Sequence, residues 1–484
     1  MGRSERAIVV LLFTLIALAM MVRPGTSVVQ SQSPLSNTLY LPLVADQPPW
    51  YNPLSAETFG DYLADPVIQR RVNELQMSWV RVTGLRWRDV EPVEGGGYQW
   101  DHPRTQFFES FLITASQLGL KPTVIIEQSP RWATILPTSC SAIRQDKLDE
   151  FANYLTAVVN RYKQPPYNVH SWELFNEPDV DPSLVGEDSG YGCWGDINDP
   201  YYGGERFGEM LQVAAPAIRA ADPTATIVFG GLLLAEAETA NPALGHPERF
   251  LQGALVSGAA DAFDVVSYHV HHQYVGPVYN YGGAGMGGSW DAWGGVTKGK
   301  PNYLNSVMAN YGVSKALWMN EGALRCPSWH PDCVSNLSLF LDTQGQFVPR
   351  ELSRTLSVGV RQFSWYTLQW SLWDEVGLLN YDGTPRPAFT SYKSFVERVR
   401  GTSFPPASVN YGSGLEAYRF QKANDPYVDL IFSPDGATHY ASVPVNKFLA
   451  AYDTFGQAIA PPTPVAGQYH FLVGYQAIYV HRLP

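Results

Sequence analysis

Short apolar runs alternate along most of the chain with segments whose apolar residues recur at helical spacing. The stretch 105–118 is one such helical segment, and Gly119 follows it as a residue that ends helices. Strands that alternate with helices in this way are typical of βαβ units, in which the strands form a parallel sheet. The predicted strands are 78–83, 121–126, 169–175, 226–230, 264–269, 316–320 and 362–367.

One further strand before residue 78 would complete the eight strand–helix units of a (β/α)8 barrel. The last helix of this barrel is predicted over 386–399. The pattern therefore indicates the α/β class, with a TIM-barrel catalytic domain over residues 48–400. Active sites of such barrels lie at the C-terminal ends of the strands, so polar residues at those ends are candidates for chemistry.

The pattern changes after Gly401 to short alternating runs separated by turn residues. Asn424-Asp-Pro426 and Pro434-Asp-Gly436 are turn signals of this kind. We therefore predict a small C-terminal antiparallel β-sandwich domain over residues 401–484, packed on the barrel.

The N-terminal segment has the form of a targeting signal. Arg3 and Arg6 precede an apolar run over 7–22, which suits a signal-peptide core and is short for a membrane-spanning helix. We predict a signal peptide or N-terminal anchor over 1–26, followed by a polar linker over 27–47. The expected location is secreted or extracytoplasmic, with membrane attachment through an uncleaved N-terminal segment as the alternative.

Export favours disulfides over free thiols for the four cysteines. Cys326 and Cys333 flank a short loop directly after a predicted strand, and we favour their pairing with each other. Cys140 and Cys193 lie in long segments after the third and fourth predicted strands and form the other favoured pair. Metal binding by the four is less favoured, because the sequence has no Cys-x-x-Cys.

Composition excludes some partners. A net charge of −12 argues against nucleic acid, because phosphate binding requires concentrated lysine and arginine. With 45% hydrophobic and 16% charged residues, the chain can bury a large core.

Two predicted strands end in an asparagine followed by a glutamate. Asn176-Glu177 follows the strand 169–175, and Asn320-Glu321 closes the run 316–320. Two carboxyl groups that face each other across a barrel mouth are the minimum equipment for cleaving a glycosidic bond. The simpler alternatives are a helix-capping or surface carboxylate for Glu177 and a strand-end salt bridge for Glu321.

Asn-Glu-Pro at one strand end and Glu-Gly at a later one resemble the motifs of clan A glycoside hydrolases, which are retaining enzymes on a (β/α)8 barrel. The segment from Trp87 to Trp100 also resembles a loop of families 39 and 42, and the C-terminal domain resembles appendages in families related to 39 and 5. The resemblance implies that Glu177 is the acid/base and Glu321 the nucleophile. It also implies that Asn176 holds the sugar 2-OH, that the substrate is a carbohydrate and that no cofactor takes part.

Arg81 lies within a predicted barrel strand, where a guanidinium must be paired because an isolated buried charge is too costly. The resemblance implies that it supports the nucleophile. A structural ion pair with Glu173 is the alternative, since Glu173 shares strand parity with Glu177.

The sequence His269-Val-His271-His272 allows two interpretations. His-x-His at a strand end begins the metal site of some barrel hydrolases, but those enzymes place it on the first strand and this cluster is on the sixth. In clan A the sixth strand often ends in a histidine followed two residues later by a tyrosine that bonds the nucleophile. His269 matches that histidine and His271 replaces the tyrosine, so Tyr274 is a second candidate for the partner of the nucleophile.

Tryptophans near strand ends are candidates for stacking on sugar rings, with ordinary core packing as the alternative. They are Trp132, Trp365, Trp370 and Trp373. The sequence as a whole predicts a retaining glycoside hydrolase that cleaves a β-linked oligo- or polysaccharide by double displacement. The alternatives are a metal-dependent barrel hydrolase that uses His269 and His271, and a barrel that binds glycans without cleaving them.

Overall fold

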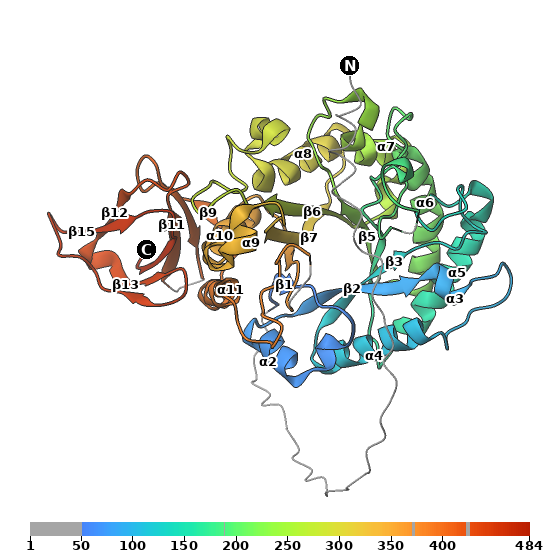
Figure 1. Ribbon diagram of the computed structural model, residues 1–484, viewed down its shortest axis with the longest axis horizontal. Helices are drawn as coiled ribbons and strands as arrows, with labels where there is room; N and C mark the ends of the chain where they lie inside the picture. The colour runs from blue at the N-terminus through green and yellow to red at the C-terminus, as the bar shows by residue number, and fades with distance from the viewer. Residues whose placement is uncertain (1–50, 188, 370–372, 423–425) are drawn as a thin grey trace, which may run out of the picture. The chain divides into compact units, whose positions relative to one another are not determined.

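The computed structural model describes residues 51–187, 189–369, 373–422 and 426–484 (Figure 1). The predicted signal or anchor and the linker lie outside the described residues. Among the helices that the structure describes, none combines the length and the apolar character that crossing a membrane requires.

Eight parallel strands form the sheet of the barrel. They are β1 (Leu54–Ala56), β2 (Trp79–Arg86), β3 (Lys121–Glu127), β4 (Ser171–Asn176), β5 (Thr226–Leu232), β6 (Val265–Gln273), β7 (Ala316–Arg325) and β8 (Gln362–Trp365). The hydrogen-bonded order is β1-β8-β7-β6-β5-β4-β3-β2. The Ser55 hydroxyl on β1 donates to the Trp79 carbonyl on β2 at 2.6 Å and links the two ends of that order. The sheet is therefore a nearly closed barrel, as predicted.

The helices follow the strands in chain order and surround the sheet (Figure 1). They are α2 (Pro66–Glu74), α3 (Trp87–Val90), α4 (Pro103–Gln117), α5 (Leu148–Tyr162), α6 (Gly204–Ala221), α7 (Phe250–Val256), α8 (Val296–Asn310), α9 (Pro331–Ser335), α10 (Leu337–Ser357) and α11 (Pro387–Val399). Helix α4 illustrates the local rules: Pro103 begins it, and Gly119 follows its end with a φ of +73°.

The chain after α11 forms two antiparallel sheets, which confirms the predicted β-sandwich. The larger contains β9 (Ala407–Ser408), β10 (Glu416–Phe420), β11 (Tyr427–Phe432), β13 (Phe448–Asp453), β14 (Ala458–Ile459) and β16 (Ile478–Arg482), and the smaller pairs β12 (His439–Pro444) with β15 (Gln468–Val473). Ile431 and Val480 of the larger sheet pack with Val443 and Phe471 of the smaller in one buried core.

An ion pair between a buried arginine and a partly buried glutamate joins the β-domain to the barrel. Arg354 on α10 is 1% exposed, and its Nε donates to Glu416 Oε1 on β10 at 3.0 Å. Lys298 on α8 donates to the same carboxylate at 3.1 Å. Burial opposes the charge of Glu416, but Arg354 outweighs that effect and holds the pKa of the carboxyl well below its usual range. The charge on Glu416 thus depends on cations from the barrel.

We predict that Arg354→Met destabilises the protein by about 1–3 kcal/mol, because it leaves a partly buried carboxylate without its main partner. The midpoint of urea denaturation, followed by tryptophan fluorescence, measures the effect. Lys393→Met is the matched control, since Lys393 pairs with Glu397 on the surface, where such pairs contribute less than about 1 kcal/mol. Equal midpoints for the two variants would contradict the predicted role of Arg354.

Candidate active site

Arg81 on β2 lies at the centre of a buried polar cluster at the C-terminal ends of the strands. It is 0% exposed, and its Nε and Nη2 donate to the two oxygens of Glu173 at 2.9 and 2.8 Å. Its Nη1 donates to Glu321 and, at 3.2 Å, to Glu57. Nη2 also donates to Asn176 Oδ1 at 2.8 Å. Both alternatives for Arg81 are therefore present, since it pairs with Glu173 and contacts Glu321 as well.

His269 on β6 lies between the two candidate carboxylates. Its Nδ1 is 2.9 Å from Glu177 Oε1, and its Nε2 is 3.6 Å from Glu321 Oε1. The imidazole is fully buried, whereas the side chains of Glu177 and Glu321 are 10% and 11% exposed. The two carboxyl groups are thus the solvent-accessible edge of a cluster whose other charges are buried.

Glu321 is surrounded by groups that favour its ionised form. His271 Nε2 is 3.1 Å from its Oε2, and Arg81 contacts its Oε1. Burial by itself disfavours the carboxylate, but His269, Arg81 and His271 together outweigh burial and hold the pKa of Glu321 well below its usual range. The group is therefore an anion across the neutral pH range.

Irregular backbone aims these side chains at Arg81. A regular strand sends consecutive side chains to opposite faces. The β6–β7 register shifts at Asn320, so Asn320 reaches Glu173 at 2.9 Å while its neighbour Glu321 reaches Arg81. On β4, Phe175 has a φ of +65°, and both Glu173 and Asn176 contact Arg81. The strand-end motifs converge because the alternation is broken at these two positions.

Gly231 on β5 lets the cluster close. Its N–H donates to Glu173 Oε1 at 3.0 Å, and its carbonyl accepts from the Glu177 N–H at 2.9 Å. A Cβ at this position would lie 2.2 Å from His269 Nε2, so the imidazole can approach only because residue 231 is glycine.

Comparison with known proteins gives this arrangement a family context. Residues 46–276 match the family model for cellulase (glycosyl hydrolase family 5). The chain is a glycoside hydrolase, and its matches resemble the families of clan A. No curated protein matches its sequence.

Solved structures share the fold of this hydrolase at low sequence identity. A family 39 glycoside hydrolase from Bacteroides cellulosilyticus is 18% identical with a TM-score of 0.67, covering 90% of this chain and 81% of the other. A family 30 endoxylanase from Clostridium papyrosolvens is 14% identical with a TM-score of 0.55, covering 89% and 95%. An exported protein from Bacteroides fragilis is 12% identical with a TM-score of 0.58, covering 89% and 98%.

Glu57 is a residue of the hydrolase's polar cluster that the sequence analysis missed. It follows β1 directly and is 1% exposed. Burial raises the pKa of Glu57 well above its usual range although Arg81 opposes the shift. The cluster thereby avoids a third buried negative charge around one guanidinium. Its position after a barrel strand was the available signal, but the sequence pattern did not locate that first strand.

Lys300 on α8 hydrogen-bonds the backbone that carries His269, and the sequence analysis also missed this residue. Its Nζ donates to the carbonyls of His269 at 2.6 Å and Leu233 at 2.8 Å. Burial lowers the pKa of Lys300 to about 8, although Asp179 and Glu177 oppose the shift. Asp179 accepts from the Leu233 and Leu234 N–H groups at 2.9 and 2.8 Å, and burial raises its pKa to about 6. No motif marked these residues in the sequence.

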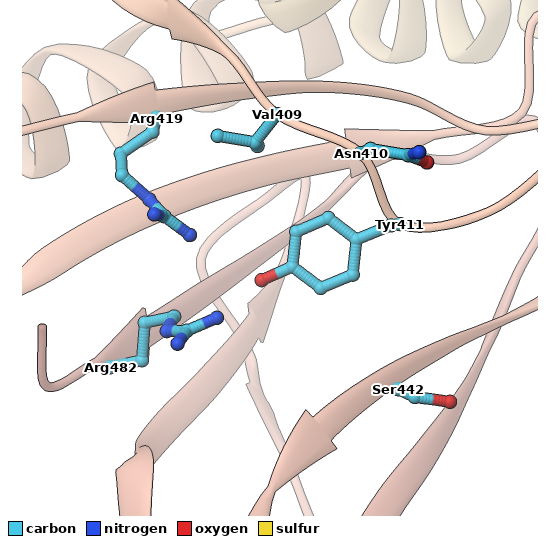
Figure 2. Close-up of a pocket in the computed structure, with 6 residues that line it drawn as sticks. All are labelled: Val409, Asn410, Tyr411, Arg419, Ser442 and Arg482. Atoms are coloured by element: carbon cyan, nitrogen blue, oxygen red, sulfur yellow. The ribbon is translucent and has the colours of Figure 1, made fainter.

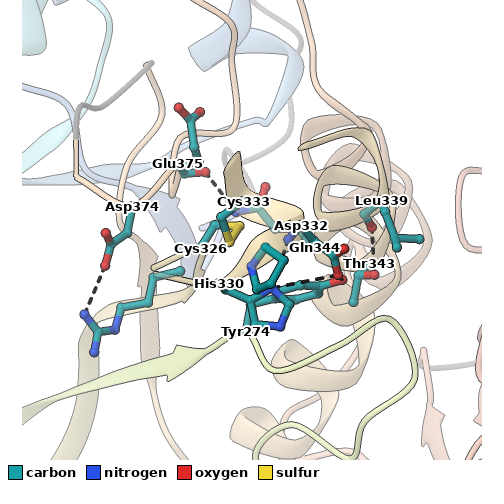
Figure 3. Close-up of a disulfide and its surroundings, with 12 residues drawn as sticks. Tyr274, Cys326, His330, Asp332, Cys333, Leu339, Thr343, Gln344, Asp374 and Glu375 are labelled. Carbon is teal, nitrogen blue, oxygen red and sulfur yellow. Dashed lines mark hydrogen bonds and ion pairs between the residues drawn. A yellow bond between two sulfur atoms is a disulfide. The ribbon is translucent and has the colours of Figure 1, made fainter. Parts of the chain in front are cut away.

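Tyr274 lies with the second disulfide instead of with Glu321. Its hydroxyl donates to Asp332 Oδ2 at 3.0 Å, and Asp332 adjoins Cys333, which is bonded to Cys326 (Figure 3). His271 therefore occupies the position of partner to Glu321. The first disulfide joins Cys140 to Cys193, so both bonds are the pairings favoured from the sequence.

The tryptophans that were candidates for sugar stacking differ in their burial. Trp365 is fully buried, and its Nε1 donates to the Val376 carbonyl at 2.8 Å, so it packs in the core and cannot stack on a sugar. Trp373 is half-buried with its ring edge-to-face against His271 at 5.0 Å, beside the carboxylates. Trp132 is half-buried and donates to the Glu91 carbonyl at 3.1 Å. Trp370 lies outside the described residues.

We predict that the imidazole of His271 titrates below about 6.5. Burial disfavours its imidazolium form and outweighs the attraction of Glu321, which lowers the pKa of His271. NMR of the enzyme labelled with 13C-histidine measures this pKa, and His271→Asn assigns the signal by its loss. A midpoint above the ordinary value would show that the Glu321 anion dominates over burial.

Proposed function

We propose that the enzyme is a retaining glycosidase that cleaves β-linked oligo- or polysaccharides by double displacement. The observation that supports the proposal is that the two carboxyl groups on either side of the His269 imidazole have different electrostatic surroundings. Glu321 is held as an anion by His269, Arg81 and His271, whereas Glu177 lies beside His269 Nδ1 at 2.9 Å. A stabilised anion suits a nucleophile, and a separate carboxyl group suits an acid/base.

In the first step, a Glu321 oxygen attacks the anomeric carbon, and the bond from that carbon to the leaving oxygen breaks. Glu177 transfers its proton to the leaving oxygen, so the departing sugar is neutral. In the second step, Glu177 takes a proton from water, the water oxygen displaces Glu321 from the anomeric carbon, and both carboxyl groups return to their initial states. Two inversions give net retention.

We assign Asn176 to the sugar 2-OH. Its Oδ1 is fixed by Arg81 Nη2 at 2.8 Å, so the amide presents its NH₂ group as the donor. The half-buried rings of Trp373 and Trp132 are the described candidates for sugar stacking. The partner is a carbohydrate and not a nucleic acid, in keeping with the net charge of −12.

We further propose that the catalytic domain spans 48–400, that the β-domain spans 401–484, and that segment 1–26 directs export, with 27–47 as a linker. Two disulfides support an extracytoplasmic location, because such bonds persist in oxidising compartments.

Turnover of a panel of aryl β-glycosides, with the anomer of the first product followed by 1H NMR, tests the mechanism. We expect the β-anomer first. Glu177→Ala should lower turnover by about 10²–10⁴-fold, because general acid–base catalysis contributes that much. Azide should restore activity with a good leaving group and give a β-glycosyl azide.

Glu187→Ala is the matched control, since Glu187 is an exposed carboxylate on the same loop and should retain full activity. Release of the α-anomer first would overturn the retaining mechanism. Binding of polysaccharide without turnover of any substrate would instead favour a non-catalytic glycan-binding barrel.

A metal-dependent hydrolase is the second candidate, because ligand atoms of His269, His271 and Glu321 lie within 4.8 Å of one another. One contact opposes it. The Arg81 guanidinium already contacts Glu321, where it would repel a divalent cation.

We therefore expect dialysis against EDTA to leave turnover unchanged, and added Zn²⁺ or Mn²⁺ to give no increase. The assay uses the best aryl glycoside of the panel. Loss of activity in EDTA that Zn²⁺ restores would replace the double-displacement proposal with the metal-dependent one.

A further inference from the structure

The β-domain contains a polar pocket that the proposed reaction does not use. Its volume is about 420 Å³, and both sheets contribute to it, since Arg419 and Arg482 lie on β10 and β16 and Ser442 lies on β12 (Figure 2). The remaining lining residues are Val409, Asn410 and Tyr411. The pocket is large enough for a sugar ring, since ligand pockets begin at about 300 Å³.

Two guanidinium groups lie near one buried carboxylate at this pocket. Asp429 is 0% exposed and accepts from Arg419 Nε and Nη2 at 2.7 Å each, and from the Tyr411 hydroxyl at 2.6 Å. Arg482 Nη1 is 4.0 Å from the same carboxylate, beyond hydrogen-bond distance. The ends of both arginines point toward the Tyr411 hydroxyl (Figure 2). Two positive charges against one negative charge leave the pocket with a net positive charge.

This positive charge is local, because the chain as a whole carries −12. A guanidinium binds a carboxylate through two parallel hydrogen bonds, which favours planar carboxylates. The Tyr411 ring, the exposed Asn410 amide and the Ser442 hydroxyl are groups that bind the face and hydroxyls of a sugar. Charge and lining together match a sugar that carries a carboxylate.

We propose that this pocket binds a uronic acid residue of an acidic polysaccharide, with Arg482 on the sugar carboxylate. The inference rests on the proposed function only for the choice of a carbohydrate. Arg419 is paired with Asp429 and contributes to the positive charge of the pocket. Asn410, Tyr411 and Ser442 contact the sugar ring. The β-domain thereby holds acidic chains on the enzyme, and salt weakens this attachment.

Isothermal titration of the full-length Glu177→Gln enzyme tests the proposal without turnover. The probes are tetragalacturonate, a glucuronate-substituted xylotriose, neutral xylotetraose and inorganic phosphate. We expect at least one acidic probe to bind more tightly than xylotetraose, and Arg482→Gln to weaken that binding by about tenfold or more, the effect of losing a charge-assisted hydrogen bond.

Arg400→Gln is the matched control, since Arg400 is an exposed arginine outside the pocket and its loss should not change binding. If circular dichroism shows that Arg482→Gln unfolds, Asn410→Ala on the exposed loop replaces it, with a several-fold loss expected. Arg419→Gln is unsuitable, because it would leave buried Asp429 without its main partner.

Three results would overturn the proposal: no preference for either acidic probe, equal binding by the Arg482 and Arg400 variants, or phosphate that competes as well as the acidic sugar. The last would identify a general anion site. Turnover of aryl glycosides by the wild-type enzyme is measured separately, so failure of the pocket and failure of the catalytic proposal are distinguishable.

Discussion

The active site depends on a single buried guanidinium. Arg81 has no exposed surface, and an uncompensated charge there would cost several kcal/mol. Glu173 meets it with two hydrogen bonds, and Glu321 and Glu57 contact its third nitrogen. The pairing works in both directions, because the cation that needs carboxylates for its own burial also holds Glu321 ionised. The same ion pairs therefore stabilise the folded barrel and keep the candidate nucleophile ionised.

That arrangement constrains the backbone around it. On both β4 and β7, residues of opposite parity contribute to the cluster, which strict alternation does not allow. The register shift at Asn320 and the positive φ of Phe175 supply the exceptions. Gly231 has no Cβ, and a Cβ at this position would clash with His269. Irregularities at the strand ends are retained here because the ion cluster requires them, as is common at functional sites.

Most of the barrel was predictable because its strands are long apolar runs separated by helical segments. The first strand was not, since Leu54–Ala56 is too short to show a pattern, and Glu57 was missed with it. The Asn-Glu motifs marked the right strand ends. The contact of Arg81 with Glu321 was implied by the resemblance, but its simultaneous contacts with Glu173 and Asn176 were not. Strict alternation separates Asn320 from Glu321, and the register shift that brings both into the cluster has no sequence signature.

Choices between similar residues also required the structure. Tryptophan serves the core and sugar stacking equally well in a sequence, and only burial separates Trp365 from Trp373. Tyr274 was a reasonable partner for Glu321 by spacing, but β6 continues to Gln273 and carries Tyr274 beyond the carboxylates to Asp332. His271 is left beside Glu321, and its neutral form can share a proton with the carboxylate without adding charge to a cluster that already contains Arg81. The ionised form of Glu321 is thus favoured mainly by His269 and Arg81, while His271 adds a hydrogen bond, so the charge of the candidate nucleophile does not require a metal ion.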